Sequence, residues 1–462
     1  MKKQRIKLSR RVKLGFYGIL CLATFGLLSW TSEGSSLFNG EAKQTFEGAQ
    51  AAPWERVEIL EDPHPGIKTE AFAEGGEHVD PLIIKWFGTA TPPSRQVMLH
   101  CASGFRGKTL PHPILLVHGA GDNANRAWMN PFRCPDLLHI PSEKWGMAQW
   151  LSQLGYSVFA VTFAHRQGCN IIQSEQIANA ITRIRRILGR ESDSTFSIDI
   201  IGHSKGNLPI RLYCSNSKEI FPDRPFLTSF RGDVRTYVAL GSPMLGMDSS
   251  FRYYGFNLLR ATMPELKGVG PIATDRMLLN GIWKSFPTES YFGKGNELWP
   301  GQAQCLFNLD RDGGIPLGVD SATPFDGNLT MLSLYNGGNS LVLSSQGIDR
   351  AIDLGERFMY RLREHGLEPS VRLLVVAGDD PVIEEENIAP TLKWLYIISG
   401  FFQQAFSAPS DGAVYLKNAT KVEEVLARGA KHLETRVFHL NHCDLIRARK
   451  VIQFVDSWLM QS

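Results

Sequence analysis

The sequence predicts an α/β protein in which a mostly parallel sheet is covered by helices on both faces. Short apolar runs without polar alternation, such as residues 113–118, are typical of strands buried on both faces. Between these runs lie segments such as 174–188, where isoleucine and leucine recur every three to four residues, as on one face of a helix. Strands that alternate with helices favour parallel pairing.

Each element of this fold is predicted from its own stretch of sequence. We expect strands at 96–100, 113–118, 156–161, 196–201, 234–240, 371–377 and 435–440, and helices at 145–154, 174–188 and 451–459. Another short strand is expected at 82–86. Residues 244–350 interrupt this rhythm and are rich in Gly, Pro, Trp and Phe. An insertion of this size usually lies over the ligand-binding edge of the sheet.

The composition favours a folded protein that does not bind nucleic acid. Hydrophobic residues make up 43% of the 462 and charged residues 21%, which is enough to form a sizeable core. The net charge is +3, and much of the positive excess lies within the first thirteen residues. Since no basic stripe with interleaved aromatic residues follows, we expect no nucleic-acid partner.

The N-terminal segment predicts a location outside the cytoplasm. The basic start is followed by an apolar, uncharged stretch from Leu14 to Trp30. We interpret residues 1–31 as an uncleaved membrane anchor, with a cleaved signal peptide as the alternative. Because the cationic flank stays inside, either reading puts the rest of the chain outside the cytoplasm, membrane-anchored or secreted.

Three further features concern the rest of the chain. We expect residues 32–95 to form a linker and irregular extension, and residues 96–462 to form one domain with an insertion at about 245–350. Six cysteines lie beyond the apolar segment, so an oxidising compartment would allow one to three disulfides, and free buried thiols are the alternative.

The motif that carries chemistry is Gly202-His203-Ser204-Lys205-Gly206, between a predicted strand and a predicted helix. A turn this sharp strains the central residue, and the glycines on either side let neighbouring backbone approach. The serine hydroxyl is then exposed at the carboxyl edge of the sheet, as in a nucleophile elbow. The strand before the motif and the helix after it make this prediction specific.

Five segments together resemble the α/β-hydrolase superfamily, and within it the lipases and esterases. They are "PILLVHGAGDN" at 113–123, "IDIIGHSKGN" at 198–207, "YVALGSPMLGMD" at 237–248, "SDGAV" at 410–414 and "FHLNHCDL" at 438–445. The resemblance covers about residues 113–462. It implies an α/β-hydrolase fold with a lid-like insertion, and a nucleophile, acid and histidine in that chain order.

The resemblance assigns the remaining groups of a catalytic triad. His442, which follows the last strand, is the expected base for Ser204. Asp411 is the expected acid because it lies in the D-G-x-V segment. The pair Asp379 and Asp380, directly after the strand at 371–377, is the alternative.

The resemblance also indicates where the oxyanion would bind. The family places one donor just after the nucleophile, which here is the backbone N–H of Lys205. The other comes from the loop after an early strand, which indicates the backbone N–H of Ala120 in "VHGAG".

The predicted function is a serine hydrolase that cleaves carboxylic esters through an acyl-enzyme, with lipid esters as the expected substrates. The aromatic segment 391–406 is either an interfacial lid or an ordinary core helix. We expect no metal and no cofactor. Three alternatives stay open: an acyltransferase or an amidase that uses the same triad, and a non-catalytic binding protein of the same fold.

Overall fold

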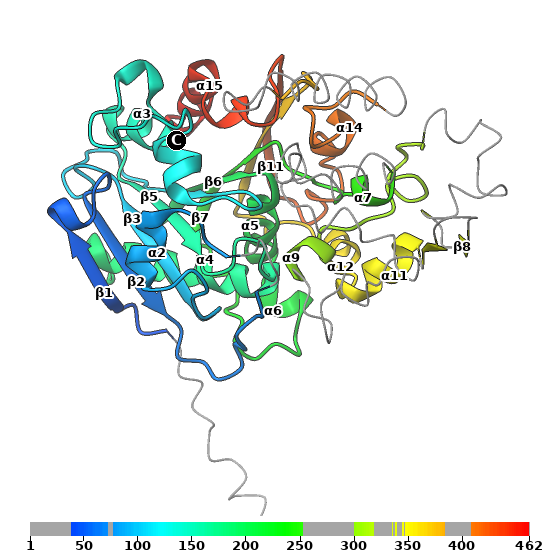
Figure 1. Cartoon of the computed structure of the whole chain (residues 1–462), viewed down its shortest axis with the longest axis horizontal. Coiled ribbons are helices and arrows are strands. Elements are labelled where there is room, and N and C mark those ends of the chain that lie inside the picture. The colour runs from blue at the N-terminus through cyan, green and yellow to red at the C-terminus, as the bar shows by residue number, and fades with distance from the viewer. Residues whose placement is uncertain are drawn as a thin grey trace, which may run out of the picture. The chain divides into compact units, whose positions relative to one another are not determined.

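The centre of the molecule is a nine-stranded sheet, seen in a computed structural model that describes residues 38–72, 77–252, 300–317, 335, 338–339, 344–345, 347–383 and 408–461 (Figure 1). The strand order is β1-β2-β3-β5-β4-β6-β7-β10-β11. The bounds are β1 Ala42–Glu47, β2 Arg56–Glu61, β3 Gln96–Cys101, β4 Ile114–Val117, β5 Val158–Phe163, β6 Ile198–His203, β7 Val234–Leu240, β10 Arg372–Gly378 and β11 Lys431–Phe438.

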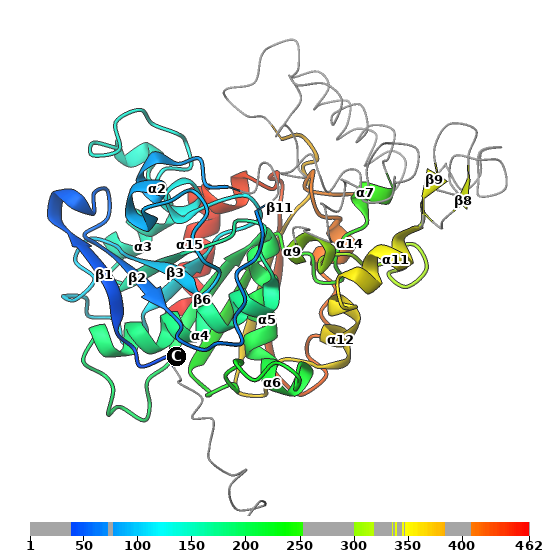
Figure 2. The same ribbon diagram turned by 60° about the horizontal axis from the view of Figure 1, so that its bottom comes forward.

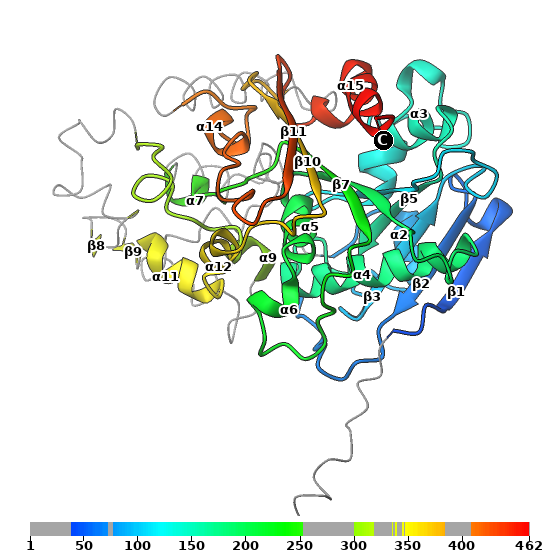
Figure 3. The same cartoon turned by 180° about the vertical axis from the view of Figure 1, so that it is seen from behind.

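The sheet is mostly parallel, as the sequence predicts. Strands β5, β4, β6, β7, β10 and β11 pair in parallel, whereas β1, β2, β3 and β5 pair antiparallel. Figure 3 shows β10 and β11 at the end of the sheet that lies opposite to β1. Because the parallel strands share one direction, their carboxyl ends meet at one edge, where side chains from distant segments gather.

Helices cover both faces of the sheet (Figure 1). One face packs against α3 Met147–Gln153 and α15 Arg449–Leu459, the other against α4 Asn170–Ile187 and α5 Asn207–Cys214. Within β4, Ile114 and Leu116 belong to the first core, and Leu115 and Val117 to the second. Successive residues of a strand point to opposite faces, so a strand covered on both sides is apolar throughout.

The remaining elements are shorter. The helices are α2 Pro81–Phe87, α6 Ser217–Ile220, α7 Ser249–Arg252, α9 Pro300–Ala303, α11 Gly347–Leu354, α12 Phe358–Glu364 and α14 Leu416–Ala419. Single turns are η1 Gly48–Gln50, η2 Asn125–Met129, η3 Ser142–Lys144, η4 Ser204–Gly206 and η8 Asp444–Ile446. From the expected insertion, α9 packs against the segment between β5 and α4, where the backbone N–H of Gly301 donates to the carbonyl oxygen of Gln167 at 3.2 Å. The strand pair β8 Gly338–Asn339 with β9 Ser344–Ser345 lies beyond the β11 end of the sheet (Figure 2).

The predicted strand at 82–86 is wrong, because these residues form helix α2. The Asp80 carboxylate accepts from the backbone N–H of Leu82 at 2.9 Å and of Ile83 at 3.4 Å, which caps the helix. Pro81 occupies the first helical position, where its missing N–H costs nothing. The pair Asp80-Pro81 is therefore a helix-start signal that outweighs the short apolar run after it.

The segment expected as a linker contributes two strands to the sheet. β1 and β2 pair with each other, and β2 pairs with β3. Val57 and Ile59 of β2 enter one core and Leu60 the other, so β2 is sandwiched like the parallel strands. Residues from Phe38 onward accordingly belong to the same compact unit as the rest of the described chain.

Two expectations concern the N-terminus and the cysteines. The predicted anchor or signal peptide at 1–31 lies outside the described residues. None of the helices in the described ranges combines the length and hydropathy that a membrane crossing requires. The six cysteines beyond the apolar segment all lie in the described ranges and form no disulfide, so the alternative without disulfides holds for them; they are Cys101, Cys134, Cys169, Cys214, Cys305 and Cys443.

Candidate active site

The predicted nucleophile lies on a strained turn between β6 and α5. Ser204 has a φ of 53°, in the left-handed region that non-glycine residues rarely adopt. A Cβ on Gly206 would lie 2.3 Å from the carbonyl oxygen of His118, and one on Gly202 would lie 2.5 Å from Oδ1 of Asn207. Neither position can carry a side chain without displacing its neighbours. Both glycines of the motif are therefore required by close packing, as in a nucleophile elbow.

Asn207, to which the sequence analysis assigns no role, stabilises this turn through its side-chain amide. Its Nδ2 donates to the carbonyl oxygens of Ser204 at 2.9 Å and Leu240 at 3.2 Å. Its Oδ1 lies 3.1 Å from the hydroxyl of Tyr237, which donates to it. The side chain is buried, so it satisfies polar groups that water cannot reach. Only the contacts between β6, β7 and α5 reveal this role.

The structure brings the predicted acid and base together. Nδ1 of His442 donates to Oδ2 of Asp411 at 2.8 Å, and the backbone N–H of His442 donates to the carbonyl oxygen of Asp411 at 2.8 Å. The other carboxylate oxygen, Oδ1, accepts from the backbone N–H of Ala413 at 2.9 Å and of Val414 at 2.7 Å. Asp411 is only 1% exposed. The D-G-x-V segment is thus a turn that fixes one carboxylate oxygen and leaves the other for the histidine.

The alternative carboxylates make other contacts. Oδ1 of Asp379 bonds Nδ1 of His439 at 3.0 Å, and that histidine side chain is 81% exposed. Oδ1 of Asp380 accepts from the backbone N–H of Val382 at 3.0 Å. Neither carboxylate bonds His442, so the geometry favours Asp411 as its partner.

Two contacts place His442 beside the nucleophile turn. The ring of His203, the residue before Ser204, lies 4.6 Å from the ring of His442, and its Nε2 donates to the carbonyl oxygen of His442 at 3.0 Å. A Cβ on Gly241, just after β7, would lie 3.0 Å from Nδ1 of His442. Serine, histidine and aspartate therefore gather at the carboxyl ends of β6, β7, β10 and β11.

The loop after β4 lies directly against the candidate nucleophile. A Cβ on Gly119 would come within 2.9 Å of Cβ of Ser204. His118 supports the loop, because its Nδ1 donates to the carbonyl oxygen of Gly119 at 2.8 Å and its Nε2 accepts from the N–H of Phe163 at 3.3 Å. Burial lowers the pKa of His118 to about 4, so the ring is neutral and can do both. Ala120 follows Gly119 in this loop and is partly exposed.

The side chain of Lys205 is buried, and its amine is hydrogen-bonded within the protein. Its Nζ donates to the carbonyl oxygen of Gly168 at 3.0 Å and to Oε1 of Gln173 at 2.8 Å. Burial lowers the pKa of this amine, and nearby Cys305 and Glu70 act in the opposite direction. The amine thus anchors the turn to the start of α4, and the backbone N–H remains the part of Lys205 that can serve a substrate.

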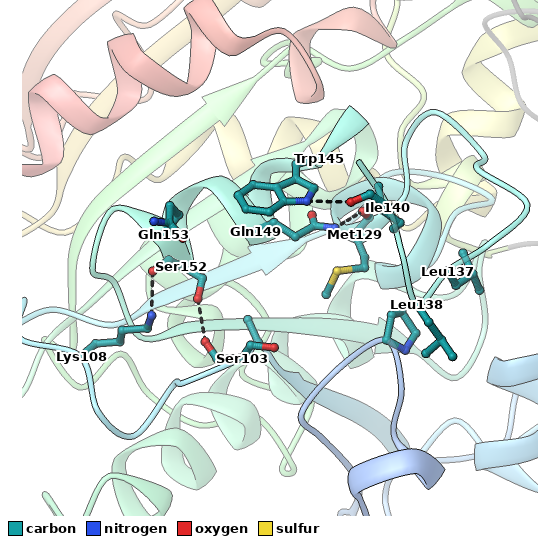
Figure 4. A pocket seen from close by; sticks show the side chains of 12 residues that line it. Ser103, Lys108, Met129, Leu137, Leu138, Ile140, Trp145, Gln149, Ser152 and Gln153 are labelled. Carbon is teal, nitrogen blue, oxygen red and sulfur yellow. Dashed lines mark hydrogen bonds between the residues drawn. The ribbon is translucent and has the colours of Figure 1, made fainter. Parts of the chain in front are cut away.

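A pocket of about 310 Å³ lies elsewhere, along α3 (Figure 4). At one end Lys108 donates to the carbonyl oxygen of Ser152 at 2.8 Å, and at the other lies Leu138, which is 67% exposed. None of the residues predicted for the active site lines this pocket. It is therefore separate from the candidate site.

Comparison with known proteins matches part of the chain to a lipase family. Residues 111–256 match the family model described as Lipase (class 2). No curated protein sequence matches the chain. Among solved structures, the mature lipase BlEst2 of Bacillus licheniformis aligns over 78% of this chain and 97% of its own, at 12% identity and a TM-score of 0.40.

Two further structures are similar at the same level. The siderophore hydrolase EstB from Aspergillus fumigatus aligns over 79% of this chain and 95% of its own, at 14% identity and a TM-score of 0.36. A thermostable carboxyl esterase from Bacillus coagulans aligns over 79% and 95%, at 13% identity and a TM-score of 0.33.

The sheet order and the turn at Ser204 define an α/β-hydrolase. The family match covers β4 to β7, including the candidate nucleophile and the loop against it, so over these residues the chain is similar to the lipases. This supports a hydrolase that acts on carboxylic esters.

Proposed function

We propose that the chain is a serine hydrolase in which Ser204, His442 and Asp411 cleave carboxylic esters. The observation that carries this proposal is the buried pair of Asp411 and His442, held against the residue that precedes Ser204. The strained backbone of Ser204 supports it independently, because such strain is typical of a nucleophile elbow.

Each group has one role in the proposed reaction. Ser204 attacks the ester carbonyl while Nε2 of His442 takes the hydroxyl proton, and His442 then protonates the leaving alcohol. Water, activated by the same nitrogen, attacks the acyl-enzyme, and the proton returns to Ser204 as the acid leaves. Asp411 holds His442 in the tautomer whose Nε2 is free to accept. The backbone N–H groups of Ala120 and Lys205 stabilise the oxyanion.

The proposed substrates are lipid esters. The match to a lipase family supports this choice, as does the aromatic segment 391–406, which lies outside the described residues. Hydrolysis of p-nitrophenyl esters with acyl chains of increasing length tests it. We expect kcat/KM to rise with chain length; a preference for acetate over longer chains would contradict a lipid substrate.

We also propose that the domain acts outside the cytoplasm, on the basis of the basic and apolar start at residues 1–31. Fractionation of cells that express the full chain tests this. Activity in the membrane or the medium is expected, and activity confined to the cytosol would contradict it.

An active-site label tests the nucleophile. A fluorophosphonate should label the wild type and fail to label Ser204→Ala. Ser103→Ala is a matched control, because Ser103 is an exposed serine outside the site, beside the pocket of Figure 4. Labelling that persists in Ser204→Ala would refute the assignment. Product analysis with an added alcohol distinguishes hydrolysis from acyl transfer, since a transferase would yield a new ester.

A further inference from the structure

His442 is held by three hydrogen bonds, and two of them go to the same residue. Its backbone N–H and its Nδ1 both donate to Asp411. The third joins its carbonyl oxygen to Nε2 of His203, at the end of β6. Of these three bonds, the one to His203 alone connects the base to the strand that carries Ser204. This bond therefore fixes the Asp411–His442 pair relative to the nucleophile strand, together with the packing of His442 against Gly241.

The tautomer of His203 follows from its partners. A carbonyl oxygen only accepts hydrogen bonds, so Nε2 must carry the proton. Nδ1 is buried, has no hydrogen-bond partner among the described residues, and faces Gly119, where an added Cβ would lie 3.3 Å away. Burial, together with the neighbouring His442, lowers the pKa of His203 to about 3. The ring is therefore neutral and protonated at Nε2.

A neutral ring at this place suits the chemistry of its neighbour. The centroids of the His203 and His442 rings are 4.6 Å apart, with 40° between their planes. A proposed general base must gain positive charge during the reaction. A second charge at this distance in a buried site would oppose that gain strongly. His203 gives contact and a hydrogen bond without adding charge.

We propose that His203 is a positioning residue that ties the base His442 to the nucleophile strand. The proposal rests on the proposed function, in which His442 is the base for Ser204. In this role His203 acts through His442, which both its ring and its Nε2 contact. Sequence position conceals this role, because 239 residues separate the two histidines.

The experiment compares three variants of the full chain in hydrolysis of p-nitrophenyl butyrate. His203→Phe keeps a ring and loses the hydrogen bond. His203→Gln keeps an N–H donor where Nε2 stands. His78→Phe is a matched control, because His78 is also buried and its Nε2 donates to a carbonyl oxygen, that of Ala164, at 2.8 Å.

We expect His203→Phe to lower kcat by about 10- to 100-fold with KM almost unchanged, since a misplacement of about 1 Å can cost on the order of 10²-fold. His203→Gln should restore most of kcat, and His78→Phe should resemble the wild type. The proposal fails if His203→Phe retains the wild-type kcat, if His203→Gln is equally impaired, or if His78→Phe loses as much. Thermal unfolding of each variant identifies any that do not fold.

A spectroscopic readout separates this proposal from the proposed function. In ¹⁵N-histidine NMR spectra, the His203 signal is the one that disappears in His203→Gln, and it should report a neutral ring protonated at Nε2 down to low pH; His78, whose Nε2 also bonds a carbonyl oxygen, should keep its own signal in that variant. A His203 ring protonated at Nδ1 would overturn the hydrogen bond to His442 whether or not the protein cleaves esters. Conversely, a correct His203 signal in a protein without Ser204-dependent activity would refute only the enzymatic function.

Discussion

Replacing Asp411 with asparagine should abolish most activity without changing the shape of the site. Two backbone N–H groups donate to Oδ1 at 2.9 and 2.7 Å, so the asparagine carbonyl oxygen must take that place. The opposite orientation would set the amide NH₂ against two donors. The NH₂ group therefore faces Nδ1 of His442, which must become an acceptor. The proton moves to Nε2, where it blocks abstraction of the serine proton.

The expected loss follows from this change of tautomer. The same substitution in a serine protease lowers kcat by about 10⁴-fold, which corresponds to about 5.4 kcal/mol at about 1.36 kcal/mol per decade. Because a short, buried hydrogen bond holds the pair here as well, we expect a loss of that order. The assay is kcat for p-nitrophenyl butyrate, with thermal unfolding to confirm that the variant folds.

Two matched variants make the result decisive. Asp379→Asn and Asp380→Asn remove carboxylates that bond His439 and the N–H of Val382, and both should keep nearly full activity. If Asp411→Asn retains more than a small fraction of kcat while either control loses it, the acid has been assigned to the wrong residue.

Three further changes test other parts of the structure. Gly119→Ala would set a methyl group 2.9 Å from Cβ of Ser204, so the activity should fall steeply. Gly107→Ala is the control, because the nearest atom to its Cβ is 3.9 Å away and its activity should match the wild type. Equal activities of the two variants would refute the close contact. Asn207→Ala removes the side-chain donor to the carbonyl oxygens of Ser204 and Leu240, so denaturant unfolding should show a loss of about 1–3 kcal/mol together with a lower kcat. An unchanged midpoint would contradict this role of Asn207. Burial raises the pKa of Glu175 to about 7 from 4.5, so the folded protein retains a proton that the unfolded chain releases, and stability should decline as pH rises through this window. Glu175→Gln should flatten that decline in the melting temperature, and an unchanged slope would assign it to other groups.

Much of the fold can be predicted from the sequence because the two faces of the sheet are both buried. A strand such as β4, whose neighbours in sequence enter different cores, must be apolar throughout, and that pattern is local. The strands of the N-terminal extension are harder to recognise because β1 is an exposed edge strand, with few buried side chains to mark it. Helix α2 was predicted as a strand because of its short apolar run, although Asp80 and Pro81 before that run are a helix-start signal.

The candidate site divides in the same way. Gly202, Ser204 and Gly206 can be recognised from sequence because the turn imposes steric demands on residues next to one another. Two groups of aspartates follow strand β10 along the chain, and spacing alone does not say which one meets the histidine. Asp411 can lie against the end of β10 because residue 378 is a glycine. A Cβ at that position would lie only 2.9 Å from the Cβ of Asp411.

The sequence by itself therefore determined the class of fold and the nucleophile turn, since these depend on local pattern and sterics, while the order of the predicted reactive groups followed from the resemblance to α/β-hydrolases. Only the tertiary structure decided that Asp411 faces His442, that the Asn207 side chain bonds the Ser204 carbonyl and that His203 bonds His442. Each of these contacts joins segments that are distant in sequence or lie on different elements. Their geometry depends on how parallel strands align at one edge of the sheet, and no local pattern records it.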